Sequence, residues 1–496
     1  MQNAKKYTKK RITIDKFVPN IDKNTNEFEI KPNVAKNCYN FKVSEGALKT
    51  GNGFEKLTLP DTKEENSTVK EFLEIPGVSF KKIWRYKYYS DFNKDYEYIL
   101  IAFGSDNKIY FVDMFGYGPI IIPINQFNFS SMPTALSFRV NGKDVMGFCS
   151  PTDNFTVWYC DDEPYQVEDI PKFSSICLHN ERLFAIDSTN NYLVRYSSNL
   201  NPLNWKASVT TTSGGTIEVN DYKGMLKNLV SFLDNVFVFR DFGVSKISGY
   251  GANSMFSAVN IYNSSCKVFC NTACICGNNI YFLQEDGLYK LDGYNVQKVD
   301  DSFSHMFVGR SQEYANTCFY NGKLYIACNL NFFDDISMGT ESNTQKNNAL
   351  IEFDITTNSY NILRGVDVLC MLAVKDLTIS KLIACVNGQN GCYMWQLTQD
   401  GCFDKTPLPK NWTGGKINFG TMDKNKILKE VNLICKNNCN LTVKTDEQTK
   451  IYNIKPKESF QKVRLNIKGK YFSFSFSSNQ KDVFIANPQF VFNVED

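Results

Sequence analysis

The stretch that decides the fold lies between Phe173 and Val296. It contains Ile176-Cys-Leu-His-Asn-Glu-Arg-Leu-Phe-Ala185 and Leu229-Val-Ser-Phe-Leu-Asp-Asn-Val-Phe-Val-Phe239, and it closes with Ile280-Tyr-Phe-Leu-Gln-Glu-Asp-Gly-Leu-Tyr-Lys-Leu-Asp-Gly293. The apolar runs are short, rich in Val, Ile, Phe and Tyr, and bounded by Asn, Asp, Gly or Ser. This pattern is typical of short antiparallel strands joined by tight turns. It predicts hairpins around Asp234-Asn235 and at Asp286-Gly287.

The same unit recurs along most of the chain. Candidate inner-strand centres fall 41 to 53 residues apart, at Ile83, Ala135, Ile176, Leu229, Cys274, Cys318 and Cys370. A repeat of about 40 to 50 residues with four short strands is the period of a β-propeller. We therefore predict an all-β chain in which residues 71–406 form a propeller of six to eight blades, with seven the best count. The rhythm of strand, Asn-Gly and strand is kelch-like, and no Trp-Asp signature is present.

The pattern of apolar and polar residues at the two ends of the chain differs from that of the repeat. After Pro407 and Pro409 the segments largely alternate apolar and polar residues, as in Tyr471-Phe-Ser-Phe-Ser-Phe476, which predicts an antiparallel β-sandwich over residues 407–496. Residues 31–70 are expected to be a strand segment that joins the propeller. Residues 1–30 are polar, and we expect an arm that becomes ordered only against a partner.

Composition and charge limit the functional classes. The chain has 496 residues, of which 43% are hydrophobic and 14% aromatic, which is enough for more than one core. It has no apolar run of about 18 residues, so no membrane-spanning segment is expected, and no secretory signal, so synthesis in the cytoplasm is expected. The net charge of +3 is uneven: residues 1–13 carry +5, residues 407–470 carry +9, and residues 14–406 carry −9. Such an acidic body is a poor nonspecific DNA binder.

Few residues suggest catalysis or metal binding. The two histidines are His179 and His305, and no Ser-His-Asp arrangement is evident around them. Most of the 16 cysteines fall in strand patterns and are expected to be reduced packing residues. The best zinc candidate is the cluster from Cys266 to Cys276, although packing in a strand explains it as well. We expect no catalytic, cofactor-binding or metal-ligating residue and no cofactor.

Clusters of charged residues allow further interpretations of the function. The acidic groups Asp161-Asp162-Glu163, Asp300-Asp301 and Asp334-Asp335 resemble glycosidase carboxylates, but they lie in turn-like contexts that favour Asp for backbone reasons. The basic residues of the C-terminal module either contact DNA or an acidic neighbour, or form a solvated sheet face: Lys424, Lys426, Lys429, Lys444, Lys462, Arg464, Lys468 and Lys470.

Several short sequence segments, in their order along the chain, resemble segments of one protein family. They are Asn40, Gly46-Ala-Leu-Lys-Thr-Gly-Asn-Gly-Phe54, Arg182-Leu-Phe-Ala185, the segment from Ser197 to Trp205, Asp286-Gly-Leu-Tyr-Lys-Leu-Asp-Gly293, and Lys462-Val-Arg-Leu-Asn-Ile-Lys-Gly-Lys-Tyr-Phe472. Together they resemble the tail hub, or packaged-DNA stabilisation, proteins of short-tailed bacteriophages, which are β-propellers. In the last phrase Lys470 stands where that family has Arg.

The resemblance implies a non-enzymatic structural protein of the virion tail. It implies several copies in a ring at the head–tail connector, below the portal and adaptor and among other tail proteins. The ring would close the DNA channel, retain packaged DNA through possible contact with it, and act in viral genome ejection. Two alternatives remain: a tail-tip propeller that binds a receptor or glycan, and a propeller glycoside hydrolase or lyase.

Overall fold

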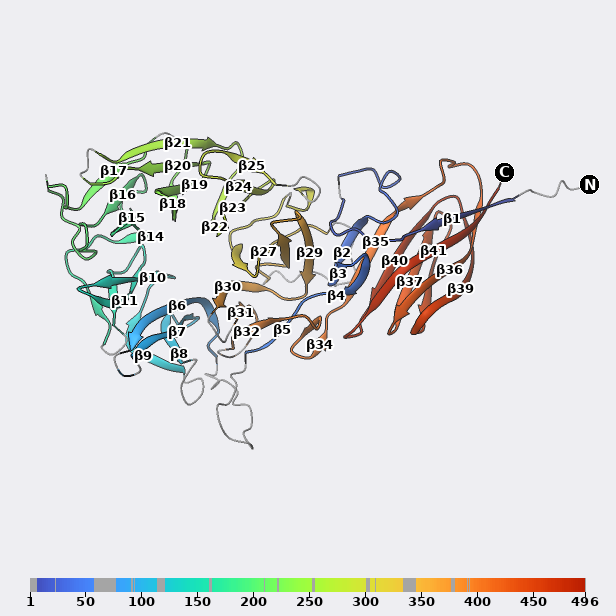
Figure 1. The fold of residues 1–496 in the computed structure, drawn as a ribbon, viewed down its shortest axis with the longest axis horizontal. Helices are drawn as coiled ribbons and strands as arrows, with labels where there is room; N and C mark the ends of the chain where they lie inside the picture. Colours follow the sequence, from blue (N-terminus) through green and yellow to red (C-terminus); the bar gives the residue numbers. More distant parts are fainter. Residues whose placement is uncertain are drawn as a thin grey trace, which may run out of the picture.

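The computed structural model describes residues 7–495, apart from residues 23, 58–76, 91, 93, 114–120, 160–162, 209, 221–222, 252–254, 300–303, 308, 333–344, 376–379, 390 and 392. Strands dominate these residues, and the described part of the chain contains no α-helix. The strands form two bodies, a ring of small sheets and a two-layered sandwich beside it, as Figure 1 shows. No helix of the described residues is long and apolar enough to cross a membrane.

The ring is a β-propeller of seven blades in the described residues. The first three blades are β6–β9 (Phe80–Ser90, Asp95–Gly104, Lys108–Asp113, Ile121–Asn128), β10–β13 (Thr134–Val140, Lys143–Cys149, Thr156–Trp158, Tyr165–Gln166) and β14–β17 (Phe173–His179, Arg182–Asp187, Leu193–Tyr196, Gly215–Glu218). The next three are β18–β21 (Leu226–Phe232, Asn235–Arg240, Gly243–Ser248, Ser257–Asn263), β22–β25 (Val268–Cys276, Asn279–Gln284, Gly287–Leu291, Val296–Lys298) and β26–β29 (Asn316–Tyr320, Lys323–Cys328, Ala349–Asp354, Ser359–Arg364). A short 3-10 helix, η2 (Ser304–Phe307), joins blades five and six.

The repeat found in the sequence matches the blades one to one. All seven predicted inner-strand centres lie in the first strands of the blades, from Ile83 in β6 to Cys370 in β30 (Val368–Lys375). The hairpin expected around Asp234-Asn235 is confirmed, because Phe232 pairs with Asn235 across the turn. The reason is physical: each blade is a local antiparallel meander, so local turn signals and apolar runs determine it.

The seventh blade is completed by the beginning of the chain. It contains β30, β31 (Ser380–Val386) and β32 (Trp395–Thr398), and its fourth strand is β5 (Gly53–Lys56). Leu397 of β32 pairs with Phe54 of β5, and the short strands β33 (Cys402–Phe403) and β34 (Thr406–Pro407) continue the sheet beyond β5. A strand from one end of the chain thus closes the ring at the other end.

The sandwich consists of two antiparallel sheets. One sheet has the order β3-β4-β41-β36-β39, with β1 also paired to β41; these are β1 (Tyr7–Thr13), β3 (Phe41–Ser44), β4 (Ala47–Thr50), β36 (Lys426–Lys436), β39 (Lys457–Gly469) and β41 (Phe484–Glu495). The other sheet has the order β2-β35-β40-β37-β38; these are β2 (Ala35–Tyr39), β35 (Lys410–Ile417), β37 (Cys439–Thr445), β38 (Thr449–Ile454) and β40 (Phe472–Ser478). The predicted alternation is clear in β40, where alternate residues are buried.

The N-terminal segments differ from their expected places. Only β5 of residues 31–70 joins the propeller, whereas β2, β3 and β4 belong to the sandwich. The expected arm is also largely ordered within its own chain. β1 pairs with β41, and Ile14 and Phe17 are each 2% exposed in the sandwich core. Ile14 and Phe17 therefore pack against residues of their own chain. The local sequence does not predict this contact.

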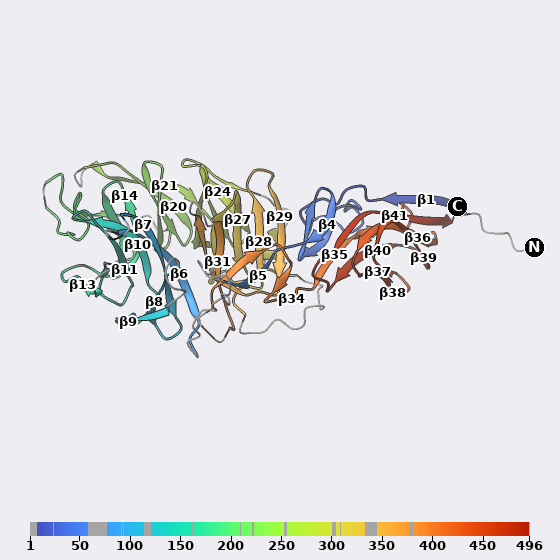
Figure 2. The ribbon, with the colours of Figure 1, turned by 60° about the horizontal axis from the view of Figure 1, so that its bottom comes forward.

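One hydrophobic core runs from the sandwich into the propeller. It joins Trp412 and Phe476 of the sandwich to Tyr360 and Phe353 of blade six and to Tyr281 of blade five. Figure 2 shows the blue strand β4 next to blade six, whereas β1 lies beside β41 at the far end of the sandwich. The two bodies therefore share buried apolar surface in addition to the chain that connects them.

The closing strand generates a stability prediction. Phe54 is 1% exposed and packs in the core of the seventh blade. Replacing a buried Phe by Ala typically costs about 3–5 kcal/mol of unfolding free energy. We expect Phe54→Ala to lower the stability of the propeller by that order in urea unfolding. The neighbouring exposed Glu55→Ala, on the opposite face, should change it by less than about 0.5 kcal/mol; equal effects would contradict the closure.

Candidate functional site: a charged junction and a basic sheet face

Asn40 fastens the sandwich to blade six. Its side-chain NH2 donates to the carbonyl oxygens of Arg364 (3.1 Å) and Pro409 (2.7 Å), and its Oδ1 accepts from the backbone N–H of Arg364 (2.8 Å). Asn40 is 1% exposed and has a φ of 58°, a conformation that Asn tolerates better than most residues. These hydrogen bonds join Asn40 to Arg364, the last residue of β29, and to Pro409, which precedes the sandwich strand β35.

Tyr360 makes a second fixed point in the same junction. Its hydroxyl donates to the carbonyl of Ile21 (2.9 Å) and accepts from the backbone N–H of Ile21 (2.9 Å), so it satisfies both backbone polar groups of that residue. Nearby, the guanidinium of Arg364 lies over the rings of Phe332 (3.7 Å) and Tyr39 (4.9 Å). Each such cation–π contact is worth about 0.5–2 kcal/mol, depending on desolvation.

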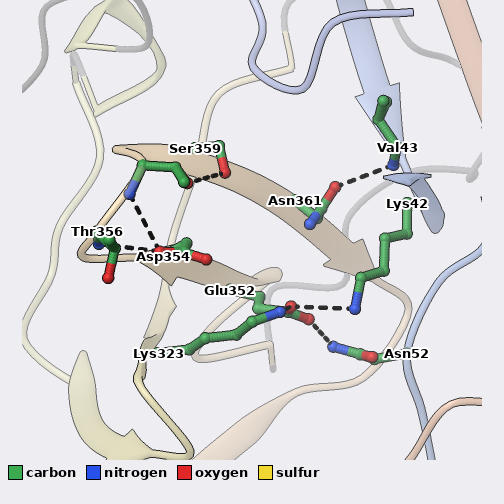
Figure 3. Close-up of polar contacts among 10 residues, drawn as sticks. Lys42, Val43, Asn52, Lys323, Glu352, Asp354, Thr356, Ser359 and Asn361 are labelled. Carbon is green, nitrogen blue, oxygen red and sulfur yellow. Dashed lines mark hydrogen bonds and ion pairs between the residues drawn. The ribbon is translucent and has the colours of Figure 1, made fainter. Parts of the chain in front are cut away.

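Glu352 is the charged centre of the junction. Its carboxylate is bound by Lys323 of β27, by the side-chain amide of Asn52, and by Lys42 of β3 at 3.4 Å (Figure 3). Its side chain is only 5% exposed, whereas the lysines are about a quarter exposed. Burial raises the pKa of Glu352, but Lys42, Lys323 and Asn52 outweigh burial, so its pKa lies below the ordinary value. The carboxylate is therefore charged at neutral pH.

The outer face of one sandwich sheet brings the basic ends of the chain together. Residues directly opposite each other in an antiparallel pair share a face. One row therefore contains Lys468, Ile427, Asn493 and Lys9, and the next contains Arg464, Glu430, Val491 and Arg11. Lys462 faces Asn432 in the third row. We call the exposed cations Lys9, Arg11, Lys462, Arg464 and Lys468 the basic sheet face.

Glu430 lies in the middle of the basic sheet face. Its Oε2 is 2.5 Å from the ammonium of Lys462. The hydrogen bond to Lys462 and the charge of that lysine lower the pKa of Glu430, and Lys9 contributes to the same shift. The pKa of Glu430 therefore reflects the proximity of a residue from each end of the chain. The face remains dominated by positive charge.

Two lysines of the basic C-terminal module are buried instead of exposed. Lys426, which the sequence places on the basic face, is 0% exposed, and its ammonium donates to the carbonyls of Thr421 (2.5 Å), Lys424 (2.9 Å) and Lys470 (2.6 Å). Burial lowers its pKa. Lys410 is held in the same way by the carbonyls of Leu408 and Gln480. These two charges hold loop carbonyls and are not available to a partner.

Acidic residues gather at the opposite end of the molecule. Residues 151–187 contain eight acidic and two basic residues. Glu163, Glu168 and Asp169 are exposed around β13 in the second blade, and we call these three the acidic end. In Figure 2 β13 lies at one extreme of the long axis, and β1 and β39 lie towards the other. The charge separation along the sequence thus becomes a separation in space.

His179 is a packed histidine. Its Nδ1 lies 2.9 Å from Ser231 Oγ, a contact that the sequence does not predict, and its Nε2 lies 3.1 Å from the side-chain nitrogen of Asn180. Because an amide NH2 can only donate, Nε2 accepts, and Nδ1 must carry the proton that it donates to Ser231. In this arrangement His179 cannot take the proton of Ser231 as a general base. Burial lowers its pKa, which keeps it neutral.

The remaining sequence candidates do not converge. Among the described residues, no three His, Cys, Asp or Glu side chains are grouped so that they could hold a metal ion. Cys274 and Cys276 have their sulfurs 3.9 Å apart, and Cys270 Sγ instead contacts the carbonyl of Arg240. The pairs Asp161-Asp162, Asp300-Asp301 and Asp334-Asp335 lie outside the described residues.

Comparisons with known proteins return similarity of structure alone. No protein-family model matches the sequence, and no curated protein does. A virginiamycin B lyase from Staphylococcus aureus is similar in structure, with a TM-score of 0.43 and 8% identity over 70% of this chain and 99% of that one. Kluyveromyces lactis Hsv2 has a TM-score of 0.34 and 8% identity over 54% of this chain and 82% of that one. The activity of the lyase belongs to that protein.

The junction generates a pH prediction. A carboxylate with a lowered folded pKa adds stability that is present above its unfolded pKa and is lost as pH falls through its folded pKa. We expect Glu352→Gln to cost roughly 2 kcal/mol of unfolding free energy at pH 7, less than the roughly 3–5 kcal/mol of a fully buried pair, because the lysines are partly exposed. The difference from wild type should shrink below about pH 4.5, near the unfolded value.

Denaturant unfolding between pH 3 and pH 8 measures this difference. Glu45 provides a matched control, because it pairs with Lys49 at 2.6 Å but its side chain is 83% exposed. Glu45→Gln should have little effect at any pH. A Glu352→Gln protein as stable as wild type at pH 7 would show that the network adds nothing.

Proposed function

We propose that this chain is a structural protein of a bacteriophage tail that assembles with other copies of itself into a ring below the portal and adaptor. The observation that carries the proposal is the meeting of both basic chain ends in one sheet face, far from the acidic end of the propeller. The phrases shared with the tail hub proteins support the viral setting. In that setting the ring closes the DNA channel and helps to retain packaged DNA.

Charge supports a particular mode of contact between copies. Residues 1–50 and 407–496, which build most of the sandwich, together carry 26 basic and 13 acidic residues, a net charge of +13. Residues 51–406 carry 29 basic and 39 acidic residues, a net charge of −10. Opposite patches on one molecule favour association in which the basic face of one copy meets the acidic end of the next. Such a heterologous contact closes into a ring when its rotation allows.

The rigid junction supports the same assembly. A ring of defined size needs a constant angle between the two contact surfaces of each copy. The shared core, Asn40, Tyr360 and the Glu352 network hold the sandwich against blade six at many points. The basic sheet face and the acidic end are therefore presented in a fixed relation, as a ring subunit requires.

The proposal predicts how assembly responds to charge and salt. Exposed charge pairs are screened within about 10 Å at roughly 0.1 M salt, so ring formation should weaken as salt rises. Neutralising Arg11, Arg464 and Lys468 with Gln should abolish rings, and so should changing Glu163, Glu168 and Asp169 to their amides. Lys206→Gln with Lys227→Gln, exposed on the propeller, serves as the control. Negative-stain images and analytical ultracentrifugation of the purified protein give the readout.

Mixing the two variants sharpens the test. A subunit that lacks the basic face and a subunit that lacks the acidic end still share one intact contact, so the mixture should form dimers but no rings. Wild-type protein that stays monomeric at high concentration and low salt would contradict ring assembly. Rings that survive both sets of changes would place the contact elsewhere.

A further inference from the structure

Two cysteines face each other across the two sheets of the sandwich. Cys435 is the second-last residue of β36 and Cys439 is the first residue of β37, so they belong to different sheets. Both are free thiols, their sulfurs are 3.2 Å apart, and Cys435 is 0% and Cys439 2% exposed. A disulfide requires the two sulfurs to approach each other by about 1 Å. The pair is therefore placed where one bond would join the sheets.

The polar contacts of the two thiols give them different roles. Cys435 Sγ donates to the carbonyl oxygen of Asn437 (3.2 Å), so the hydrogen between the two sulfurs is donated by Cys439. This hydrogen bond lowers the pKa of the Cys435 thiol, and together with burial it raises the pKa of Cys439. Cys435 therefore loses its proton first. Because the thiolate is the reactive form of cysteine, Cys435 is the nucleophile of the pair.

An exposed turn covers the pair. It consists of Lys436, Asn437 and Asn438, which are all exposed. The side chain of Asn437 donates to the carbonyl of Asp482, and the hydroxyl of Ser478 donates to the carbonyl of Asn438 (2.7 Å). Exposed turns open locally at a lower free energy than the core that they cover. Opening of this turn admits a molecule as small as hydrogen peroxide to the two sulfurs.

A second close pair of thiols, Cys274 and Cys276, has a different geometry and serves as an internal control. Their sulfurs are 3.9 Å apart, but both residues lie in one strand, β22. Residues two apart in a strand are separated by about 6.6 Å, and their side chains stand side by side. A disulfide holds its Cβ atoms about 3.5–4.5 Å apart, so this pair cannot close without distorting the strand.

We infer that Cys435 and Cys439 form an oxidation site for peroxide, at which a disulfide forms and fastens the two sheets of the sandwich together. The thiolate of Cys435 attacks one oxygen of hydrogen peroxide and the O–O bond breaks, which leaves a sulfenic acid and one water. The thiol of Cys439 then attacks the sulfur of Cys435, forms the S–S bond and releases a second water. The two thiols give up two electrons and two protons, and the peroxide takes up both. The site goes beyond the assembly role and does not rest on it.

Peptide mapping of the full-length protein tests the inference. The folded protein is treated with hydrogen peroxide, the remaining thiols are blocked with iodoacetamide during denaturation, and trypsin is added without reductant. Trypsin cuts after Lys436, between the two cysteines, so it places them in separate peptides, residues 430–436 and 437–444. We expect these two peptides to be joined and the thiols of the control pair in β22 to be blocked separately. Unlinked peptides after peroxide treatment would overturn the proposal.

Two variants separate the roles of the cysteines. Cys439→Ala removes the thiol that closes the bond, so the linked peptides should be lost and the sulfenic acid of Cys435 should accumulate, where dimedone captures it. Cys328→Ala removes another thiol that is 0% exposed and should leave the linked peptides unchanged. Absence of the dimedone adduct from residues 430–436 of Cys439→Ala would overturn the assignment of Cys435 as the nucleophile.

The melting temperature shows whether the bond fastens the sheets. We expect peroxide-treated protein to melt about 2 °C or more above the same sample reduced afterwards with dithiothreitol. Dithiothreitol restores the thiols and leaves methionine sulfoxide in place, so the comparison isolates the disulfide. The two values should coincide for Cys439→Ala, and coincidence in the wild-type protein would contradict the fastening. None of these readouts involves ring formation, so a failure here is distinguishable from a failure of the assembly proposal.

Discussion

The whole structure depends on strand pairing between residues 7–56 and residues 395–495. β5 completes the seventh blade against β32, and β2 pairs with β35 in the sandwich. β1 and β4 extend the other sandwich sheet by pairing with β41. One short N-terminal segment therefore passes through both bodies and closes each of them. Without it, the propeller would have an open edge at β32, and unpaired strand edges invite association with other chains.

This arrangement has a consequence for folding. Contacts between residues that lie far apart in sequence require loop closure before they contribute stability, and proteins rich in such contacts fold slowly. The entropic cost of closure rises only slowly with loop length, so the final state is not strongly penalised. Local hairpins within the blades can form first, and the N-terminal strands can then add to edges that are already present. The Glu352 and Asn40 contacts between the segment and blade six become possible only at that stage.

The local sequence pattern predicted the inner strands of all seven blades, but not the strand that closes the seventh blade or the surface of the sandwich. The seven centres from Ile83 to Cys370 lie in the first strands because each blade is a meander whose turns and apolar runs are adjacent in sequence. The partners of β1 to β5 could not be predicted in this way, since no local period shows which distant strand a segment will join. Lys462, Arg464 and Lys468 were expected on a basic face, but the addition of Lys9 and Arg11 was missed for the same reason: Lys9 and Lys468 occupy one row only because β1, β41, β36 and β39 are neighbours. The exposure of Lys426 was mispredicted because the loop carbonyls that surround its ammonium come from separate turns.

Hydrogen–deuterium exchange on the full-length protein tests most directly whether the N-terminal segment closes both bodies. The account predicts that amides of Gly53–Lys56 exchange as slowly as those of Trp395–Thr398, and that amides of Ala35–Tyr39 exchange as slowly as those of Lys410–Ile417. Both N-terminal strands should lose protection together as denaturant is added, because β5 and β2 are protected chiefly by pairing with β32 and β35. Fast exchange of the N-terminal peptides beside slow exchange of β31 and β40 would contradict the closure and the fixed relation of the two bodies.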